Sequence, residues 1–231
     1  MLLLFFGYFM NTKKILLITL LVNFIFILVG VLIGNPPEQY FSKEATYITW
    51  VSFFQLLIVA YLSWGIFKNG TYTSILKSPT LLWAIIAIGF LYLALDEVIR
   101  IHENLDHIIH RVFHLTQTSF TDRLDDIIVG IYGIIGIFVL YIFRNELKKH
   151  KSSLPIFLIG FLFFFLMVVV DMSVNNNDIV KLITTDKAIR HILFSTLKIF
   201  EEVFKLVAEA LFIGAFYSCL KNSKRSIMTN E

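Results

Sequence analysis

The stretch LKIFEEVFKLVAEALFIGAFYSCL, residues 197–220, places three glutamates and two lysines in a run that is otherwise mostly apolar. About 20 such residues are what an α-helix needs to cross the hydrocarbon of a bilayer. Glu202 and Glu209 are seven residues apart and share one helix face, with Lys205 between them. An ionised carboxylate within the hydrocarbon is costly unless it is paired, protonated or bound to a cation. The run predicts a transmembrane helix with a functional Glu209, although a Lys205–Glu209 ion pair one turn apart would also satisfy the charge.

The whole chain has the composition of an integral membrane protein. Of its 231 residues, 57% are hydrophobic, 24 are phenylalanine and only 16% are charged, whereas soluble domains carry about 25% charged residues. We therefore predict a single all-α transmembrane domain over residues 1–231. The first apolar run is interpreted as an uncleaved anchor, and the preceding MNTKK favours Met10 as the natural start. Long apolar runs predict six spans, at residues 15–34, 46–67, 79–97, 127–143, 154–172 and 198–220.

The chain lacks the sequence signatures of several common activities. It has no nucleotide-binding loop, nucleophile elbow, redox cysteine pair or haem motif. No basic patch interleaved with aromatics occurs, so nucleic acid is not an expected partner. The single cysteine, Cys219, is predicted to be a small apolar residue of the last helix. Gly130, Gly133 and Gly136 in the fourth run are predicted to let a neighbouring helix approach closely.

Basic residues in the short loops predict which ends of the spans face the cytoplasm. With a cytoplasmic amino terminus, 11 of the 20 basic residues fall on the inside, together with only two of the 17 acids, Glu146 and Glu231. Every short loop agrees with this orientation. We predict a multi-pass protein of a bacterial inner membrane with both termini cytoplasmic. The basic residues on the inside are Lys13, Lys14, Lys68, Lys77, Arg144, Lys148, Lys149, Lys151, Lys221, Lys224 and Arg225.

The stretch LDEVIRIHENLDHIIHRVFH, residues 95–114, follows the third span and carries four of the chain's six histidines. No Gly or Pro occurs between Gly89 and Gly130. We therefore predict that the third helix continues to about residue 115 as an amphipathic extracytoplasmic extension, which either projects outward or bends onto the membrane surface. The polar positions are Asp96, Arg100, Glu103, His107, His110 and His114, and the apolar positions are Val98, Ile101, Leu105, Ile108, Ile109 and Val112.

Two interpretations fit these histidines. His107, His110 and His114 could form the water-facing side of an interfacial helix. Alternatively, His110 and His114, four residues apart, could chelate a divalent ion with His107 or Asp106 as a third ligand, although the general-base glutamate of the HExxH pattern is missing. His102 projects toward the apolar side, one turn before Asp106, and a carboxylate there would orient its ring. His102 is thus either a functional group or a structural, hydrogen-bonded histidine.

Acidic and histidine side chains from four predicted spans fall at the outer ends of these helices. We predict that they meet in one extracytoplasmic pocket, since all these ends lie at the same membrane face. Asp125 and Asp126 also suit a simpler role, because a helix amino terminus favours negative charge. Asp171 either lines the pocket or begins the polar loop after the fifth span. The full set is Asp96, Glu97, His102, Glu103, Asp125, Asp126, Asp171, Glu201 and Glu202.

Two of these stretches resemble motifs of uncharacterised polytopic bacterial membrane proteins. LDEVIRIHE is similar to a motif with Leu or Phe, two acids, three residues, an apolar residue and then His-Glu. The stretch EEVFKLVAEALFIGAF resembles a late helix of those proteins, which begins with two glutamates and carries a lysine three residues further on. The resemblance implies a shared site and no particular activity. Its residues here are Asp96, Glu97, His102, Glu103, Glu201, Glu202 and Lys205.

The first functional hypothesis is a metal-dependent hydrolase embedded in the membrane, with a lipid or another small molecule as its ligand. A divalent ion such as zinc would lower the pKa of a bound water for attack on a lipid ester, amide or phosphoester. Glu97 or Glu103 would be the general base, and His102 a ligand or proton shuttle, so these three are the expected catalytic residues. The expected metal ligands are Asp96, His102, Glu202 and Glu209.

Two further hypotheses need no reaction, so whether the chain is an enzyme stays open. A sensor or accessory subunit could respond to pH or metal, because histidine changes charge near neutral pH. A small transporter could use Glu209 as its deep ionisable group, although no pair of spans broken by Gly or Pro marks a substrate site at the midplane. In each case the lipid bilayer surrounds the chain, and the sequence does not address its oligomeric state.

Overall fold

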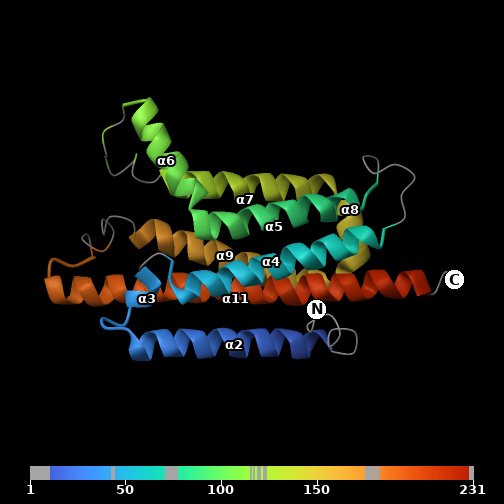
Figure 1. Cartoon of the computed structure of the whole chain (residues 1–231), viewed down its shortest axis with the longest axis horizontal. Helices are drawn as coiled ribbons and strands as arrows, with labels where there is room; N and C mark the ends of the chain where they lie inside the picture. The colour runs from blue at the N-terminus through green and yellow to red at the C-terminus, as the bar shows by residue number, and fades with distance from the viewer. Residues whose placement is uncertain are drawn as a thin grey trace.

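The structure is a computed structural model that describes residues 11–42, 45–70, 78–114, 116, 118, 121, 124–174, 180 and 183–228, with backbone alone at 125–126 and 225–228. Across these residues the regular structure is entirely helical (Figure 1), so the all-α prediction is confirmed. Met10, the expected start, lies outside the described residues. The helices are α2 (Thr12–Ile33), α3 (Gln39–Ser42), α4 (Tyr47–Lys68), α5 (Leu81–Ile99), α6 (Ile101–Val112), α7 (Leu124–Ile142), α8 (Arg144–Leu147), η3 (Lys148–Ser153), α9 (Leu154–Val174) and α11 (Lys187–Met228).

Five helices of the described chain are long and apolar enough to cross a membrane. Five of the six predicted spans therefore have the length and composition of a membrane helix, and the fourth corresponds to α7, a helix of 19 residues whose apolar part among the described side chains is Ile127–Ile142. The α6 helix lies at one end of the bundle and α8 at the other (Figure 1), so these ends are called the α6 face and the α8 face. The five long segments are Thr12–Ile33, Tyr47–Lys68, Leu81–Ile99, Arg144–Val174 and Lys187–Lys224.

The central helix of the bundle is α11, which contains the stretch at residues 197–220. It packs against α9, α4 and α2, while α4 packs against α5. Its side chains are buried almost without interruption from Leu206 to Leu220, where these neighbours cover it. The helix has 42 residues and is therefore about 63 Å long at ~1.5 Å per residue. That is roughly twice the ~30 Å of hydrocarbon, so α11 extends beyond the predicted span at both ends.

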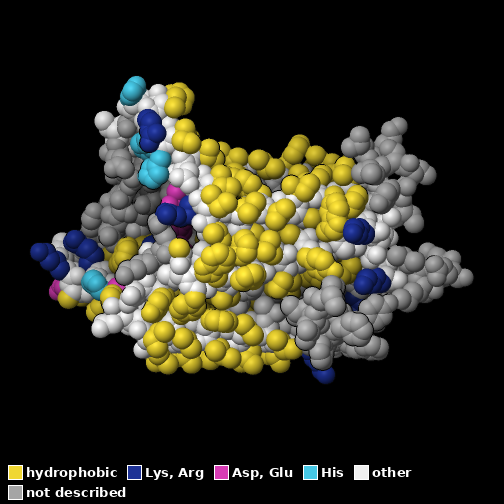
Figure 2. All heavy atoms as spheres, in the orientation of Figure 1, with side chains coloured by type: hydrophobic (Ala, Val, Ile, Leu, Met, Phe, Trp, Pro, Cys, Tyr) yellow, Lys and Arg dark blue, Asp and Glu magenta, His cyan; other side chains and the backbone are white. Residues whose placement is uncertain are grey.

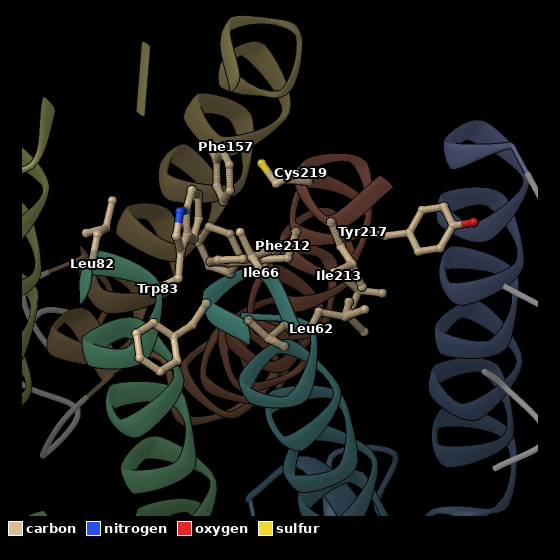
Figure 3. Close-up of a cluster of buried hydrophobic side chains, with 14 of the residues drawn as sticks. Leu62, Ile66, Leu82, Trp83, Phe157, Phe212, Ile213, Tyr217 and Cys219 are labelled. Carbon is tan, nitrogen blue, oxygen red and sulfur yellow. The ribbon is translucent and has the colours of Figure 1, made fainter. Parts of the chain in front are cut away.

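Aromatic side chains fill the core toward the α8 face (Figure 3). The ring of Phe216 on α11 lies 4.9 Å from that of Phe157 on α9 and 6.0 Å from that of Trp83 on α5, and both pairs are nearly perpendicular. Such edge-to-face pairs contribute about 0.5–1.5 kcal/mol each beyond area burial. Cys219 is fully buried beside this cluster, as predicted.

The glycines of α7 do not pack against another helix among the described residues. A methyl group built at Gly130, Gly133 or Gly136 would meet nothing within 4 Å. The predicted close approach is therefore wrong within this chain, because α7 lies at the edge of the bundle (Figure 1). Other glycines are closely packed, among them Gly30 of α2, where an added Cβ would press on the Tyr47 hydroxyl and on the Phe41 ring.

We expect Gly30→Ala to destabilise the fold by about 1–3 kcal/mol, the usual cost of overpacking. The matched change Gly133→Ala should alter stability by less than about 1 kcal/mol, since alanine suits a helix interior and meets no neighbour there. Thermal unfolding of both variants in one detergent measures the difference. Equal melting temperatures would contradict the packing of α2 on Tyr47.

The third span ends at Arg100, and α6 is a separate helix, so the prediction of one helix continuing to about residue 115 is wrong. Arg100 has a left-handed backbone with φ of 56°, and its N–H donates to the Asp96 carbonyl at 2.7 Å. The Asp96 carboxylate accepts the backbone N–H of His102 at 2.9 Å, which satisfies a free donor at the start of α6. The helix therefore bends, one of the two predicted arrangements, and runs across the direction of the spans (Figure 1).

Candidate functional site

Lys205 lies at the centre of a largely buried ion cluster between α5 and α11. Its Nζ atom lies 2.8 Å from Glu97 Oε1 on α5 and 2.8 Å from the carboxylate of Glu202, one turn earlier on α11. The three side chains retain only 13% to 18% of their exposure. Lys205 thus pairs with these two acids instead of Glu209, the partner that a simple ion pair within α11 would require. The cluster holds α5 against α11, because a buried charge left without its partner is strongly destabilising.

Glu209 lies one turn deeper along α11, between α11 and α4, and is 4% exposed. Ser52 Oγ of α4 donates a hydrogen bond of 2.5 Å to Glu209 Oε1. The second oxygen, Oε2, is buried and has no hydrogen-bond partner among the described residues. Buried polar atoms are almost always partnered, and a carboxylate inside a membrane protein requires neutralisation. The Oε2 atom is therefore where a proton or a small cation would bind.

A polar layer beside Glu209 joins α2, α4 and α11. Asn23 and Gln55 exchange two hydrogen bonds of 3.3 and 2.7 Å between their amide groups. Asn23 also donates to the Leu206 carbonyl at 2.7 Å. Such interhelical bonds stabilise membrane bundles by about 1–2 kcal/mol at most. The sequence analysis missed Asn23, Ser52 and Gln55, although each is an isolated polar residue in an apolar run, which is the signal that identifies them.

Asp96 holds His102 at the junction of α5 and α6. The Nδ1 atom of His102 lies 2.9 Å from Asp96 Oδ2, and Asp96 is buried. The expected partner, Asp106, instead lies 2.9 Å from His110 Nδ1. The difference follows from the helix break, which places the first turn of α6 over Asp96. His102 is therefore oriented by a carboxylate, as the sequence suggested, but by a different one.

Other acids of the predicted pocket form separate ion pairs. Glu103, in the first turn of α6, lies 2.9 Å from the guanidinium group of Arg100, the residue before the helix. Glu201 and Asp171 lie 2.8 and 3.5 Å from the Lys198 ammonium, which links α9 to α11. Asp171 thus faces α11 from the end of α9. At the outer ends of these helices the acids are thus paired around two lysines, Lys198 and Lys205.

The histidine stripe ends with α6. His114 lies beyond the helix with a positive φ of 50°, so His110 and His114 do not share a helix face as a chelating pair would. The half-buried His110 is paired with Asp106 instead. Asp125 and Asp126 fall in the first turn of α7, and their side chains lie outside the described residues.

The four predicted metal ligands are divided between two places. Asp96 and His102 pair with each other, whereas Glu202 and Glu209 lie along α11. In the part of the chain that the structure describes, no group of three or more His, Cys, Asp or Glu side chains is arranged to hold a metal ion. The cation beside Glu202 is the ammonium group of Lys205. The site therefore offers carboxylates around a lysine, a donor set unlike the usual zinc sites.

The cluster and Glu209 together have more acidic than basic groups. Glu97, Glu202 and Glu209 would supply three negative charges and Lys205 one positive charge, so the fully ionised group would have a net charge of −2. Like charges repel strongly where water is excluded. Uptake of protons or of a small cation would remove the excess. The arrangement is suited to exchange of positive charge between the membrane interior and one face of the bundle.

Comparison with protein families matches residues 15–220 to a domain of unknown function, DUF8692. The match covers both stretches that resemble motifs of uncharacterised membrane proteins, and it is consistent with membership of an uncharacterised family. No match was found among curated proteins or among solved structures.

Proposed function

Since the chain belongs to the DUF8692 family, a domain of unknown function, we propose its role from its own buried charges: proton-coupled transport of a small cationic solute. Glu209 is the exchanging group, and the Glu97–Lys205–Glu202 cluster sets its charge environment. The observation that carries the proposal is the unpartnered, buried Oε2 atom of Glu209 beside an excess of acids over lysine.

The location of Glu209 supports exchange rather than a purely structural role. Glu209 accepts a hydrogen bond from Ser52 of α4. Lys205, one turn earlier on the same helix, α11, pairs with Glu97 of α5. A change of charge at Glu209 alters the electrostatic balance across three helices, of which α4 packs against both α5 and α11. Ionisable residues within membrane proteins commonly mark ion or proton pathways. A proton and a cationic solute would compete for the same carboxylates, so that binding of one releases the other.

The orientation of the bundle supports access from outside the cell. The start of α2 and the end of α11 lie at the α8 face (Figure 1), and the basic residues of the short loops favour a cytoplasmic α8 face. Glu97 lies near the end of α5 at the α6 face. We therefore place both termini in the cytoplasm of a bacterial cell and the cluster toward the extracytoplasmic side of its inner membrane.

The two other hypotheses from the sequence have less support. A metal-dependent hydrolase would use Glu97, His102 and Glu103, but Glu97 pairs with Lys205 and Glu103 pairs with Arg100. A sensor would bind protons at the same cluster without moving a solute. The transport measurement described next distinguishes a sensor from a transporter.

Proteoliposomes loaded with a pH-sensitive dye test the proposal. Gradients of sodium, potassium, magnesium and tetramethylammonium are imposed one at a time, and proton movement is recorded. We expect at least one cation to drive proton movement in the opposite direction, because both compete for Glu209. Glu209→Gln should abolish the signal, since the amide keeps an acceptor for Ser52 but cannot exchange a proton.

Glu146→Gln is the matched control. Glu146 is also 4% exposed, but it lies at the α8 face, where Trp83 Nε1 donates to it at 3.3 Å. This variant should retain exchange. Proton movement that is independent of every cation, or exchange that persists in Glu209→Gln, would contradict coupled transport through Glu209.

A further inference from the structure

The α6 helix has an apolar face that remains exposed. Ile101, Leu105, Ile108 and Val112 recur at steps of four, three and four residues, so they share one side of the helix. Leu105 is 37% exposed, Ile108 52% and Val112 62%. A contiguous apolar surface of this kind marks a contact with a membrane or a partner.

The direction of α6 decides between these contacts. The helix runs obliquely across the direction of the spans, at one end of the bundle, and extends past α5 and α7 (Figure 1). In a bilayer that contains the spans, it lies along the membrane surface, beside the bundle. Figure 2 shows apolar side chains along one edge of α6 that lead onto the apolar surface of the spans, with histidine and basic side chains on the rest of the helix. The exposed stripe therefore continues the surface that contacts lipid.

We propose that α6 is an interfacial helix that binds the lipid surface next to its own bundle. Leu105, Ile108 and Val112 lie at the boundary between headgroups and acyl chains, and the exposed side chains of His107 and Arg111, each about 100° around the helix from the apolar residue that follows it, lie in water. Amphipathic helices with an apolar stripe and a polar, basic face bind membranes in this way. The lipid is that of the leaflet at the α6 face.

Contacts at the helix break keep α6 at this angle. Asp96 binds both the backbone N–H and the Nδ1 atom of His102, each at 2.9 Å. The Arg100 N–H closes the end of α5 on the same residue. Since these bonds fix the first turn of α6, the rest of the helix extends over the neighbouring lipid. The inference concerns this placement alone and does not depend on proton coupling at Glu209.

Site-directed fluorescence in the full chain tests the placement. Cys219 is the only cysteine, so Cys219→Ala provides a background for single labels at Ile108→Cys and at the adjacent His107→Cys. Each variant carries a nitrobenzoxadiazole dye in nanodiscs, which leave both membrane faces accessible. Phosphatidylcholine with brominated acyl chains and aqueous iodide are the two quenchers. We expect lipid quenching at position 108 to exceed that at 107 about twofold or more, since the apolar face of an interfacial helix sits ~5–10 Å into the boundary, and iodide to show the reverse order.

Two outcomes would overturn the proposal. Equal iodide quenching at 107 and 108 would show that the apolar face lies in water. Protection of 108 from both quenchers would show that protein, such as a second copy of the chain, covers it. Val112→Cys and Arg111→Cys repeat the comparison one turn further on, so the test does not depend on one variant folding.

Discussion

Replacing Lys205 by methionine should lower the free energy of unfolding by about 3–5 kcal/mol, the usual loss when one partner of a buried ion pair is removed. Glu97 and Glu202 each lie 2.8 Å from the Lys205 Nζ atom, and the variant leaves both in the bundle without their cation. Methionine is also long, unbranched and flexible, so the change removes charge more than packing. Unfolding in mixed micelles by titration with sodium dodecyl sulfate, followed by circular dichroism, measures the loss.

Two controls separate charge from packing in this experiment. The triple variant Lys205→Met, Glu97→Gln, Glu202→Gln should recover much of the stability, because neutral amides carry no uncompensated charge. Glu103→Gln is the matched change in a partly exposed pair: Glu103 lies 2.9 Å from Arg100, and the two side chains are 31% and 42% exposed, so the pair should contribute only about 0–1 kcal/mol. Similar losses for Lys205→Met and Glu103→Gln would contradict a cluster that depends on buried charge.

The membrane helices were predictable because their signal is local. Apolar runs of sufficient length identify α2, α4, α5, α9 and α11 within a few residues, except that α11 begins at Lys187 and ends at Met228. Those extra turns carry polar and basic side chains and extend beyond the hydrocarbon, so hydropathy does not detect them. The prediction that the α7 glycines pack against a neighbouring helix was wrong for another reason. Their spacing identifies a helix face without bulky side chains, but it does not identify the helix that contacts that face.

The break at Arg100 was not predictable from local signals. A left-handed residue that is neither Gly nor Asn is uncommon, and no Gly or Pro marks the position. The Asp96 carboxylate stabilises the break from four residues earlier in the chain. Because of the break, His102 pairs with Asp96, and Asp106 pairs with His110.

The acids and the lysine of the candidate site were identified from the sequence, but their pairing was not. Glu97 and Lys205 are 108 residues apart and meet only because α5 and α11 are neighbours. Periodicity places Glu202 and Lys205 on one helix and cannot choose the third partner. Asn23 and Ser52 each carry the local signal of one polar residue in an apolar run, but the sequence does not say which helix that residue faces.

Glu209 should hold a proton in neutral buffer when no cationic solute is bound. Its environment is buried and shared with two other carboxylates and a single lysine, and an ionised carboxylate there has no partner for Oε2 among the described residues. A protonated carboxyl donates one hydrogen bond and accepts others, so the Ser52 hydroxyl can still donate to Oε1. Ser52→Ala should therefore shift the carbonyl stretch of the protonated Glu209 without removing it.

Infrared difference spectroscopy of the reconstituted protein at neutral pH tests the central claim most directly, because it detects protonated carboxyl groups in the membrane. The spectrum of the wild-type chain minus that of Glu209→Gln should contain a carbonyl band of a protonated carboxyl, sensitive to deuterium exchange, which disappears in alkaline buffer and is absent from the corresponding Glu146→Gln difference. A spectrum in which Glu209→Gln removes only ionised-carboxylate bands would contradict the account, because Glu209 would then be charged and unable to exchange a proton for a cation.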